Sequence, residues 1–382
     1  MIPRSSHQLQ AIAEDKSAHG EKSGHGGGNA THRHQLPTRE SAARDIGSVS
    51  AELIKTPSSN WQTQLAKAIK TPEALCEFLQ LDPAWLPGAD SGHALFNIRV
   101  PHAYIERMER GNPNDPLLRQ VLPLQEESRV LEGFVSDPLD EAEHRPCPGL
   151  IHKYKSRVLL IGSGACAINC RYCFRRHFPY GDNTLSQQSL DTIVSYLQAH
   201  PEINEVILSG GDPLASSDKR LAKMVTALEA VPHLVRLRIH TRLPVVIPDR
   251  VDEALLDWLR NTRLQTVIVL HINHPQEIDS AVENACGKLT KAGATLLNQS
   301  VLLRGVNDRV ETLKTLSEAL FAIRVLPYYL HVLDPVAGAA HFDVPDEEAK
   351  ILVKALRKEV SGFLVPRLVR EIPGEASKTP LL

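Results

Sequence analysis

Strand-like and helix-like segments alternate from about residue 151 onward, and this alternation constrains the fold most. Aliphatic and β-branched runs predict strands over 158–161, 205–209, 235–239, 265–270, 295–297 and 328–332. Helical patterns follow several of these runs, for example over 186–199 and 217–230. Repeated strand–helix units of this length predict a parallel sheet with helices outside it. About six such units predict an α/β fold, a partial and open (β/α)6 barrel, with function at the carboxyl ends of its strands.

Two different regions precede this barrel. Residues 1–55 are rich in Gly, His and Ser and contain few large apolar residues. Such a segment cannot bury enough apolar surface to offset its ordering entropy, so we predict a disordered tail there. From Trp61 onward, apolar residues recur at helical spacing. We therefore predict a helical N-terminal region over 56–150, followed by the barrel and a C-terminal segment over 151–382.

The overall charge and the apolar runs narrow the class of partner. Lys and Arg total 43 against 45 Asp and Glu, which predicts neither nucleic-acid nor membrane binding. The apolar runs are too short for a membrane-spanning helix. The first residues also lack the apolar core of a secretory signal. Because free cysteines in a chain without such a signal indicate a reducing compartment, we expect a cytoplasmic protein.

Three cysteines, Cys166, Cys170 and Cys173, lie close together directly after the first predicted barrel strand. Cysteine thiolates are the usual ligands of iron–sulfur clusters, and this Cys-x3-Cys-x2-Cys spacing can hold three irons of a [4Fe–4S] cubane. The fourth iron would then have an open position for a substrate or a second cofactor. Zinc sites usually have a second cysteine pair downstream, whereas the remaining cysteines here are isolated. The pattern favours a cluster, with a zinc or redox site as the alternative.

Other polar residues have ordinary interpretations when they are taken alone. The segment 209–213, Ser-Gly-Gly-Asp-Pro, is a turn by its composition. Lys378 lies close to the C-terminus, where lysines are usually solvated, although an apolar run over 363–365 predicts a strand before it. Arg175 and Arg176 could be solvated cations. A family resemblance changes the interpretation of each of them.

The cysteine triplet, followed by the aromatic Phe174, resembles that of the radical S-adenosylmethionine enzymes. In these enzymes the open iron chelates the amino and carboxyl groups of the methionine moiety. The resemblance implies that Cys166, Cys170 and Cys173 bind a [4Fe–4S] cluster. It also implies S-adenosylmethionine contacts along the loop after the second barrel strand, at Ser209, Gly210, Gly211 and Asp212.

Several blocks in the right order narrow the resemblance to the lysine 2,3-aminomutases, over roughly residues 60–380. The matching blocks are 152–158, 171–177, 209–213, 298–308 and 327–334. The resemblance implies a radical S-adenosylmethionine barrel and conversion of L-lysine to β-lysine. It also implies pyridoxal phosphate, on which the α-amino group migrates after a 5′-deoxyadenosyl radical has taken the β-hydrogen.

The same resemblance implies roles for further residues. Lys378 would carry pyridoxal phosphate, with Lys153 and Arg157 at its phosphate and Tyr154 beside its ring. His271 and Gln299 would be additional S-adenosylmethionine contacts. Arg175 would bind the substrate carboxylate, a role suited to a guanidinium. Asp334 and Glu371 would bind the substrate ε-ammonium, although Glu371 departs from the usual Asp by one methylene.

Residues 170–180 and the short end after Lys378 resemble one branch of this family, which makes β-lysine for elongation factor P. Arg309 also stands where we would expect a zinc-binding cysteine of the catabolic enzymes. This branch implies an (R)-β-lysine product, a separate ligase and a flavodoxin- or ferredoxin-type reductant. An aminomutase for glutamate or ornithine, a methylthiotransferase and a non-catalytic metal-binding protein stay open. The two acids favour lysine, and methylthiotransferases have additional cysteines.

Overall fold

The computed structural model describes residues 60–82, 84, 86–180 and 187–382. The predicted disordered tail over 1–55 lies outside these residues. The described chain forms one sheet with its strands in sequence order. These strands are β1 (Leu150–Tyr154), β2 (Arg157–Ser163), β3 (Glu205–Gly210), β4 (Arg236–Thr241), β5 (Gln265–His271), β6 (Thr295–Val301), β7 (Leu326–His331), β8 (Arg367–Arg370) and β9 (Thr379–Pro380).

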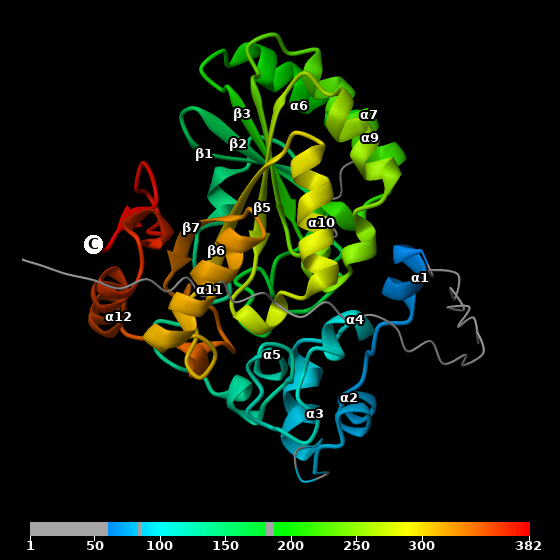
Figure 1. The fold of residues 1–382 in the computed structure, drawn as a ribbon. Helices are drawn as coiled ribbons and strands as arrows, with labels where there is room; N and C mark the ends of the chain where they lie inside the picture. The colour runs from blue at the N-terminus through cyan, green and yellow to red at the C-terminus, as the bar shows by residue number, and fades with distance from the viewer. Residues whose placement is uncertain (1–59, 83, 85, 181–186) are drawn as a thin grey trace, which may run out of the picture. The chain divides into compact units, whose positions relative to one another are not determined.

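Strands β2 to β8 run parallel, while β1 and β9 pair antiparallel at the two edges. Each strand from β2 to β7 is followed by at least one helix, and these helices lie outside the sheet (Figure 1). The prediction of a partial, open (β/α)6 barrel is therefore confirmed. In the described chain β8 adds one more parallel strand, which the sequence pattern had placed too early. Residues 363–365 were predicted as a strand, but Gly362–Leu364 is a 3-10 helix, and β8 begins only after Pro366.

The strands and helices follow from their local sequences. β3 is buried along nearly its whole length, as expected for a parallel strand that is covered on both faces. Asp252 and Asp279 cap the helices after β4 and β5 by accepting hydrogen bonds from backbone N–H groups. The α-helices in the described residues are α1 (Trp61–Ala66), α2 (Pro72–Leu79), α3 (Leu86–Leu95), α4 (His102–Ile105), α5 (Pro116–Arg119), α6 (Gln187–Ala199), α7 (Asp218–Glu229), α8 (Leu243–Val246), α9 (Glu253–Asn261), α10 (Ser280–Lys291), α11 (Val310–Ala322) and α12 (Asp346–Glu359).

The N-terminal helices pack at the carboxyl end of the parallel strands. Arg107, just after α4, donates hydrogen bonds to the backbone oxygens of Val245, at 2.5 Å, and Glu277. Val245 lies in α8, directly after β4, and Glu277 lies in the 3-10 helix Pro275–Glu277, shortly after β5. Pro57–Leu382 forms one compact unit, and the predicted boundary between residues 150 and 151 stays a prediction. None of the described helices combines the length and apolar character that crossing a membrane requires.

Candidate active site

The three predicted cluster ligands share the loop that follows β2. Cys166, Cys170 and Cys173 are free thiols, and each is partly exposed. Burial raises the pKa of the Cys166 thiol, and burial together with neighbouring Cys170 raises the pKa of Cys173 to about 11. Within the described residues, no group of three or more His, Cys, Asp or Glu is arranged around one metal ion. A cubane cluster makes a different demand, because each thiolate binds a separate iron.

The cysteine loop is anchored by buried ion pairs to the N-terminal region. The Arg171 Nε donates to Glu127 Oε1 at 2.8 Å, and its backbone N–H donates to the Gln120 carbonyl at 2.9 Å. Arg176 donates to the other Glu127 oxygen at 2.7 Å. These side chains are buried, so the interpretation of Arg176 as a solvated cation is wrong. A buried charge cluster of this kind stabilises one loop conformation, because losing either partner would leave an unpaired charge.

The glycines of the second loop allow it to lie directly against the cysteine loop. Gly210 has a φ of +114°, and a Cβ there would lie 2.6 Å from the Ser163 carbonyl oxygen. A Cβ on Gly211 would lie 2.6 Å from the carbonyl oxygen of Ala165. The Gly211 N–H donates to Ser163 at 2.7 Å. The two glycines are therefore required for contact between two loops, whatever else they bind.

Asp212 joins this second loop to the next one. Its carboxylate accepts hydrogen bonds from the Thr241 hydroxyl at 2.7 Å and from the backbone N–H groups of Leu214, Arg242 and Leu243. Burial raises the pKa of Asp212, and these hydrogen bonds partly oppose the shift. The structure thus gives Asp212 a positioning task between β3 and β4. Its predicted contact with S-adenosylmethionine stays a prediction.

Arg175 reaches from the cysteine loop to the second loop. Its NH1 donates to the Ser209 hydroxyl at 3.0 Å and to the Gly210 carbonyl at 3.3 Å. Its Nε and NH2 form a bidentate pair with the Glu141 carboxylate, at 2.9 and 2.7 Å. Arg175 is 6% exposed, so it is no solvated cation. Glu141 was missed at the sequence level, and it occupies the edge of the guanidinium that a substrate carboxylate would otherwise use.

His271 and Gln299 lie side by side on β5 and β6 as paired residues of the sheet. The His271 Nε2 lies 3.2 Å from the hydroxyl of Tyr172, which belongs to the cysteine loop. Burial and the charge of Arg242 lower the pKa of His271 to about 3, so this imidazole is neutral near pH 7. The structure therefore brings both residues to the side of the barrel that holds the cysteine loop.

A second cluster of polar residues lies between the two edges of the sheet. Lys378, just before β9, forms an ion pair with Glu371, just after β8. The Tyr154 hydroxyl, from edge strand β1, donates to Glu371 at 3.1 Å, and the Lys153 Nζ lies 3.7 Å from the same carboxylate. The Arg157 guanidinium lies 4.1 Å from the centroid of the Tyr154 ring. These four basic or aromatic residues are the set predicted to bind pyridoxal phosphate.

The two predicted ammonium-binding acids differ in their charge state. Burial acts to raise the pKa of Glu371, but the charges of Lys378 and Lys153 outweigh it and hold this pKa below its usual value. Burial raises the pKa of Asp334 to about 7, an effect that Lys378 opposes and Glu371 reinforces. Near neutral pH, Glu371 is thus ionised while Asp334 is close to half protonated. A second cation near Asp334 would favour its ionised form.

His240, at the end of β4, lies within electrostatic reach of both clusters. Its pKa is lowered by burial and by the charges of Arg238, Lys378 and Arg175. Its Nε2 is buried and has no hydrogen-bond partner in the part of the chain that the structure describes. Sequence reasoning missed His240, although a histidine at the end of a predicted strand was an available signal.

Comparisons with known proteins identify the family of the chain. Residues 160–320 match the model of the Radical SAM superfamily. An L-lysine 2,3-aminomutase of Escherichia coli (strain K12) is 53% identical over 330 residues, which cover 86% of this chain and 96% of the relative. One of Haemophilus influenzae is 50% identical over 320 residues, covering 84% and 95%.

Among solved structures, one of anSMEcpe with bound AdoMet aligns with a TM-score of 0.41 and 14% identity, over 54% of this chain and 58% of that one. The level of identity to the curated relatives decides the family. The chain belongs to the L-lysine 2,3-aminomutase family of radical S-adenosylmethionine enzymes, isomerases that use a [4Fe–4S] cluster, S-adenosylmethionine and pyridoxal phosphate.

Proposed function

We propose that this enzyme converts L-lysine to (R)-β-lysine, which a separate ligase then attaches to elongation factor P. The observation that supports lysine as the substrate is the Glu371 carboxylate, which binds the alkylammonium group of Lys378 in this structure. Lys378 stands in for the ε-ammonium of a substrate lysine. Glutamate lacks such a cation at the end of its side chain, so this acid would gain no partner from it. The resemblance of residues 170–180 to the elongation factor P branch supports the fate of the product.

Cys166, Cys170 and Cys173 are the proposed ligands of the cluster. Three soft thiols on one loop suit iron, and the loop is anchored through Arg171 at the carboxyl end of the sheet. When bound, the reduced cluster supplies the electron that cleaves S-adenosylmethionine. Ser209, Gly210 and His271 contact residues of this loop, and Gln299 pairs with His271 in the sheet. These four residues are the proposed S-adenosylmethionine contacts, together with Gly211 and Asp212.

Lys378 is the proposed attachment point of pyridoxal phosphate, which when bound provides the π-system for amino migration. The cations of Lys153 and Arg157 suit a phosphate dianion. The Tyr154 ring lies against the Arg157 guanidinium, and its hydroxyl donates to Glu371. Glu371 holds the Lys378 ammonium in the absence of ligands. With pyridoxal phosphate bound to Lys378, the Nζ would no longer be a free ammonium, and Glu371 would be available to a different ammonium group.

Substrate lysine would then be bound at both of its ends. Arg175 is the proposed partner of the α-carboxylate, next to Ser209. Because Glu141 occupies its Nε and NH2 edge, the substrate carboxylate must use the remaining N–H groups or displace Glu141. Asp334 and Glu371 are the proposed partners of the ε-ammonium. Holding both ends fixes the β-carbon relative to the cofactors, which is the main contribution of positioning to such a reaction.

The experiment is an anaerobic assay with S-adenosylmethionine, pyridoxal phosphate, dithionite and either lysine, ornithine or glutamate. Chiral chromatography should show (R)-β-lysine from lysine and much less product from the other two. The (S) enantiomer, or a preference for glutamate, would refute the proposal.

Replacing dithionite with a reduced flavodoxin or ferredoxin tests the reductant. A reducing compartment such as the cytoplasm suits an oxygen-sensitive cluster. Incubating the β-lysine product with elongation factor P and the ligase tests whether the product is attached to that factor.

A further inference from the structure

Arg242 is the first residue after β4, and the topology places it beside the cysteine loop. β2 and β4 flank β3 in the parallel sheet, so their carboxyl ends meet at the same edge. The backbone N–H groups of Arg242 and Leu243 donate to Asp212 Oδ2 at 2.8 and 2.9 Å. The turn that carries Arg242 is thereby fixed to the loop after β3.

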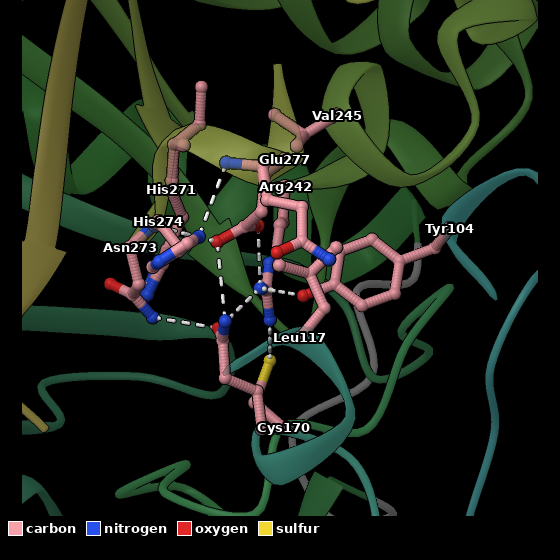
Figure 2. A network of polar contacts seen from close by, with 12 residues as sticks. Tyr104, Leu117, Cys170, Arg242, Val245, His271, Asn273, His274 and Glu277 are labelled. Carbon is pink, nitrogen blue, oxygen red and sulfur yellow. Dashed lines mark hydrogen bonds and ion pairs between the residues drawn. The ribbon is translucent and has the colours of Figure 1, made fainter. Parts of the chain in front are cut away.

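The Arg242 guanidinium contacts a proposed cluster ligand directly. Its NH1 donates to the Cys170 sulfur at 2.8 Å, as Figure 2 shows. Its NH2 contacts Glu277 Oε2 at 2.8 Å, Gln120 Oε1 at 2.7 Å and the Tyr104 hydroxyl at 2.9 Å. Arg242 is only 6% exposed, and the other three residues are fully buried. The cation is therefore held in one place and has little access to solvent.

One N–H group of this guanidinium has no acceptor in the described part of the chain. The Arg242 Nε is buried and lacks a hydrogen-bond partner. In a planar guanidinium the Nε–H lies on the same edge as NH2, away from the NH1 group that contacts the Cys170 sulfur. The contact between NH1 and the sulfur is therefore the observation that relates Arg242 to a cluster bound at Cys170.

We infer that Arg242 raises the reduction potential of the [4Fe–4S] cluster, because its buried positive charge lies within hydrogen-bond distance of the Cys170 sulfur. Charge and hydrogen bonds at the sulfurs are among the factors that set the potential of such clusters. Reduction adds one electron from the external reductant and makes the cluster more negative. A fixed cation therefore stabilises the reduced form more than the oxidised form. Glu277 partly offsets this cation, so its charge acts in the opposite direction.

This inference rests on the proposed cluster ligands, and its test separates the two. The reconstituted full-length enzyme is titrated with dithionite, and the reduced cluster is followed by electron paramagnetic resonance. Wild type without a cluster would refute the ligand assignment itself. Given a cluster, Arg242→Gln should shift the midpoint potential to more negative values, and Arg242→Lys should shift it less. Arg242→Gln with full iron and sulfide content and an unchanged midpoint would refute the inference alone.

Two further variants control for disturbance of the buried network. Tyr104→Phe removes one contact of the Arg242 NH2 group while leaving the sulfur contact, so it should leave the midpoint unchanged. Glu277→Gln keeps Arg242 and removes the opposing charge, so the midpoint should shift to more positive values. If the Arg242→Gln variant does not retain the cluster, the Glu277→Gln variant provides the test. A more positive midpoint potential in that variant supports the role of charge, and an unchanged midpoint potential refutes it.

Discussion

The cysteine loop and the C-terminal lysine cluster are built in contrasting ways. Arg171, Arg175 and Arg242 are buried around the cysteine loop, and each contacts several partners on different segments of the chain. Around Lys378, by contrast, the charged side chains are partly exposed and depend on one carboxylate, Glu371. A redundant buried network suits a group that stays bound and must keep one geometry. A cluster built around one acid suits a site whose charges change as ligands enter.

The sharpest test of this contrast removes one group from each region, beginning with the cysteine loop. Cys170→Ala should abolish product formation, because a cubane cannot keep the same attachment with only two thiolates. Iron and sulfide content should fall with the activity. Cys147→Ala is the matched control, since Cys147 is also a partly exposed free thiol but lies outside the loop. Normal cluster content in the Cys170 variant would contradict the assignment.

Lys378→Ala should also abolish product formation, but it should leave iron, sulfide and the reduced-cluster resonance intact. The two regions would then be separable, as their independent contact networks predict. Borohydride reduction followed by peptide mass spectrometry should locate the pyridoxal group on Lys378 in wild type and find none in the variant. Lys350→Ala is the control, because Lys350 pairs with the exposed Glu347 on α12, away from Glu371. Retained activity after loss of Lys378 would refute the attachment site.

Glu371→Gln should raise the KM for lysine about tenfold to a hundredfold, which corresponds to the loss of one hydrogen bond between charged groups. The reason is that Gln keeps the shape but removes the charge that faces the ammonium. Pyridoxal occupancy, measured in the same samples, separates a substrate effect from a cofactor effect. Glu375→Gln changes an exposed acid on the neighbouring turn and should have no effect. An unchanged KM in the Glu371 variant would show that the ε-ammonium binds elsewhere.

The same contrast explains which parts of the molecule could be predicted from the sequence. The six strand–helix units have local signals, because apolar periodicity and capping residues such as Asp252 operate within a few positions. The cysteines likewise form a short local motif. The strand expected at 363–365 was wrong because that run lies between Gly362 and Pro366, and Phe363 is 58% exposed. Three apolar residues alone could not show that the strand paired with β7 begins only at Arg367.

The partners that support the site could not be predicted, because each lies far away in the sequence. Glu141 pairs with Arg175, 34 residues later, and Arg242 contacts Cys170, 72 residues earlier. No local pattern distinguishes a buried acid or arginine with such a partner from a solvated one. Family resemblance supplied Arg175, Asp334 and Glu371 because they match motif positions. It supplied neither Glu141 nor Arg242, so these needed the three-dimensional structure.

The smallest expected effect is a pH dependence caused by Asp334. Burial raises its pKa from the ordinary 3.8 to about 7 in the folded, ligand-free enzyme. The folded state thus holds this proton more tightly than the unfolded state. The contribution of Asp334 to the free energy of unfolding is therefore present below about pH 4 and is lost as the pH rises through about 7.

Binding of lysine should change in the opposite direction. The ionised form of Asp334 is the one that attracts an ammonium, so the KM for lysine should fall by a few-fold as the pH rises through the pKa of Asp334 in the loaded enzyme. Lys378 favours that ionised form, so any loss of positive charge at Lys378 when pyridoxal phosphate is bound would place this transition above the value of the ligand-free enzyme. Asp334→Asn should flatten the KM profile and the pH dependence of unfolding together, whereas Asp257→Asn, at an exposed position, should flatten neither. If the KM for lysine still depends on pH in the Asp334→Asn variant, another group causes that dependence. Glu371 would then be the acid of the two that responds to substrate.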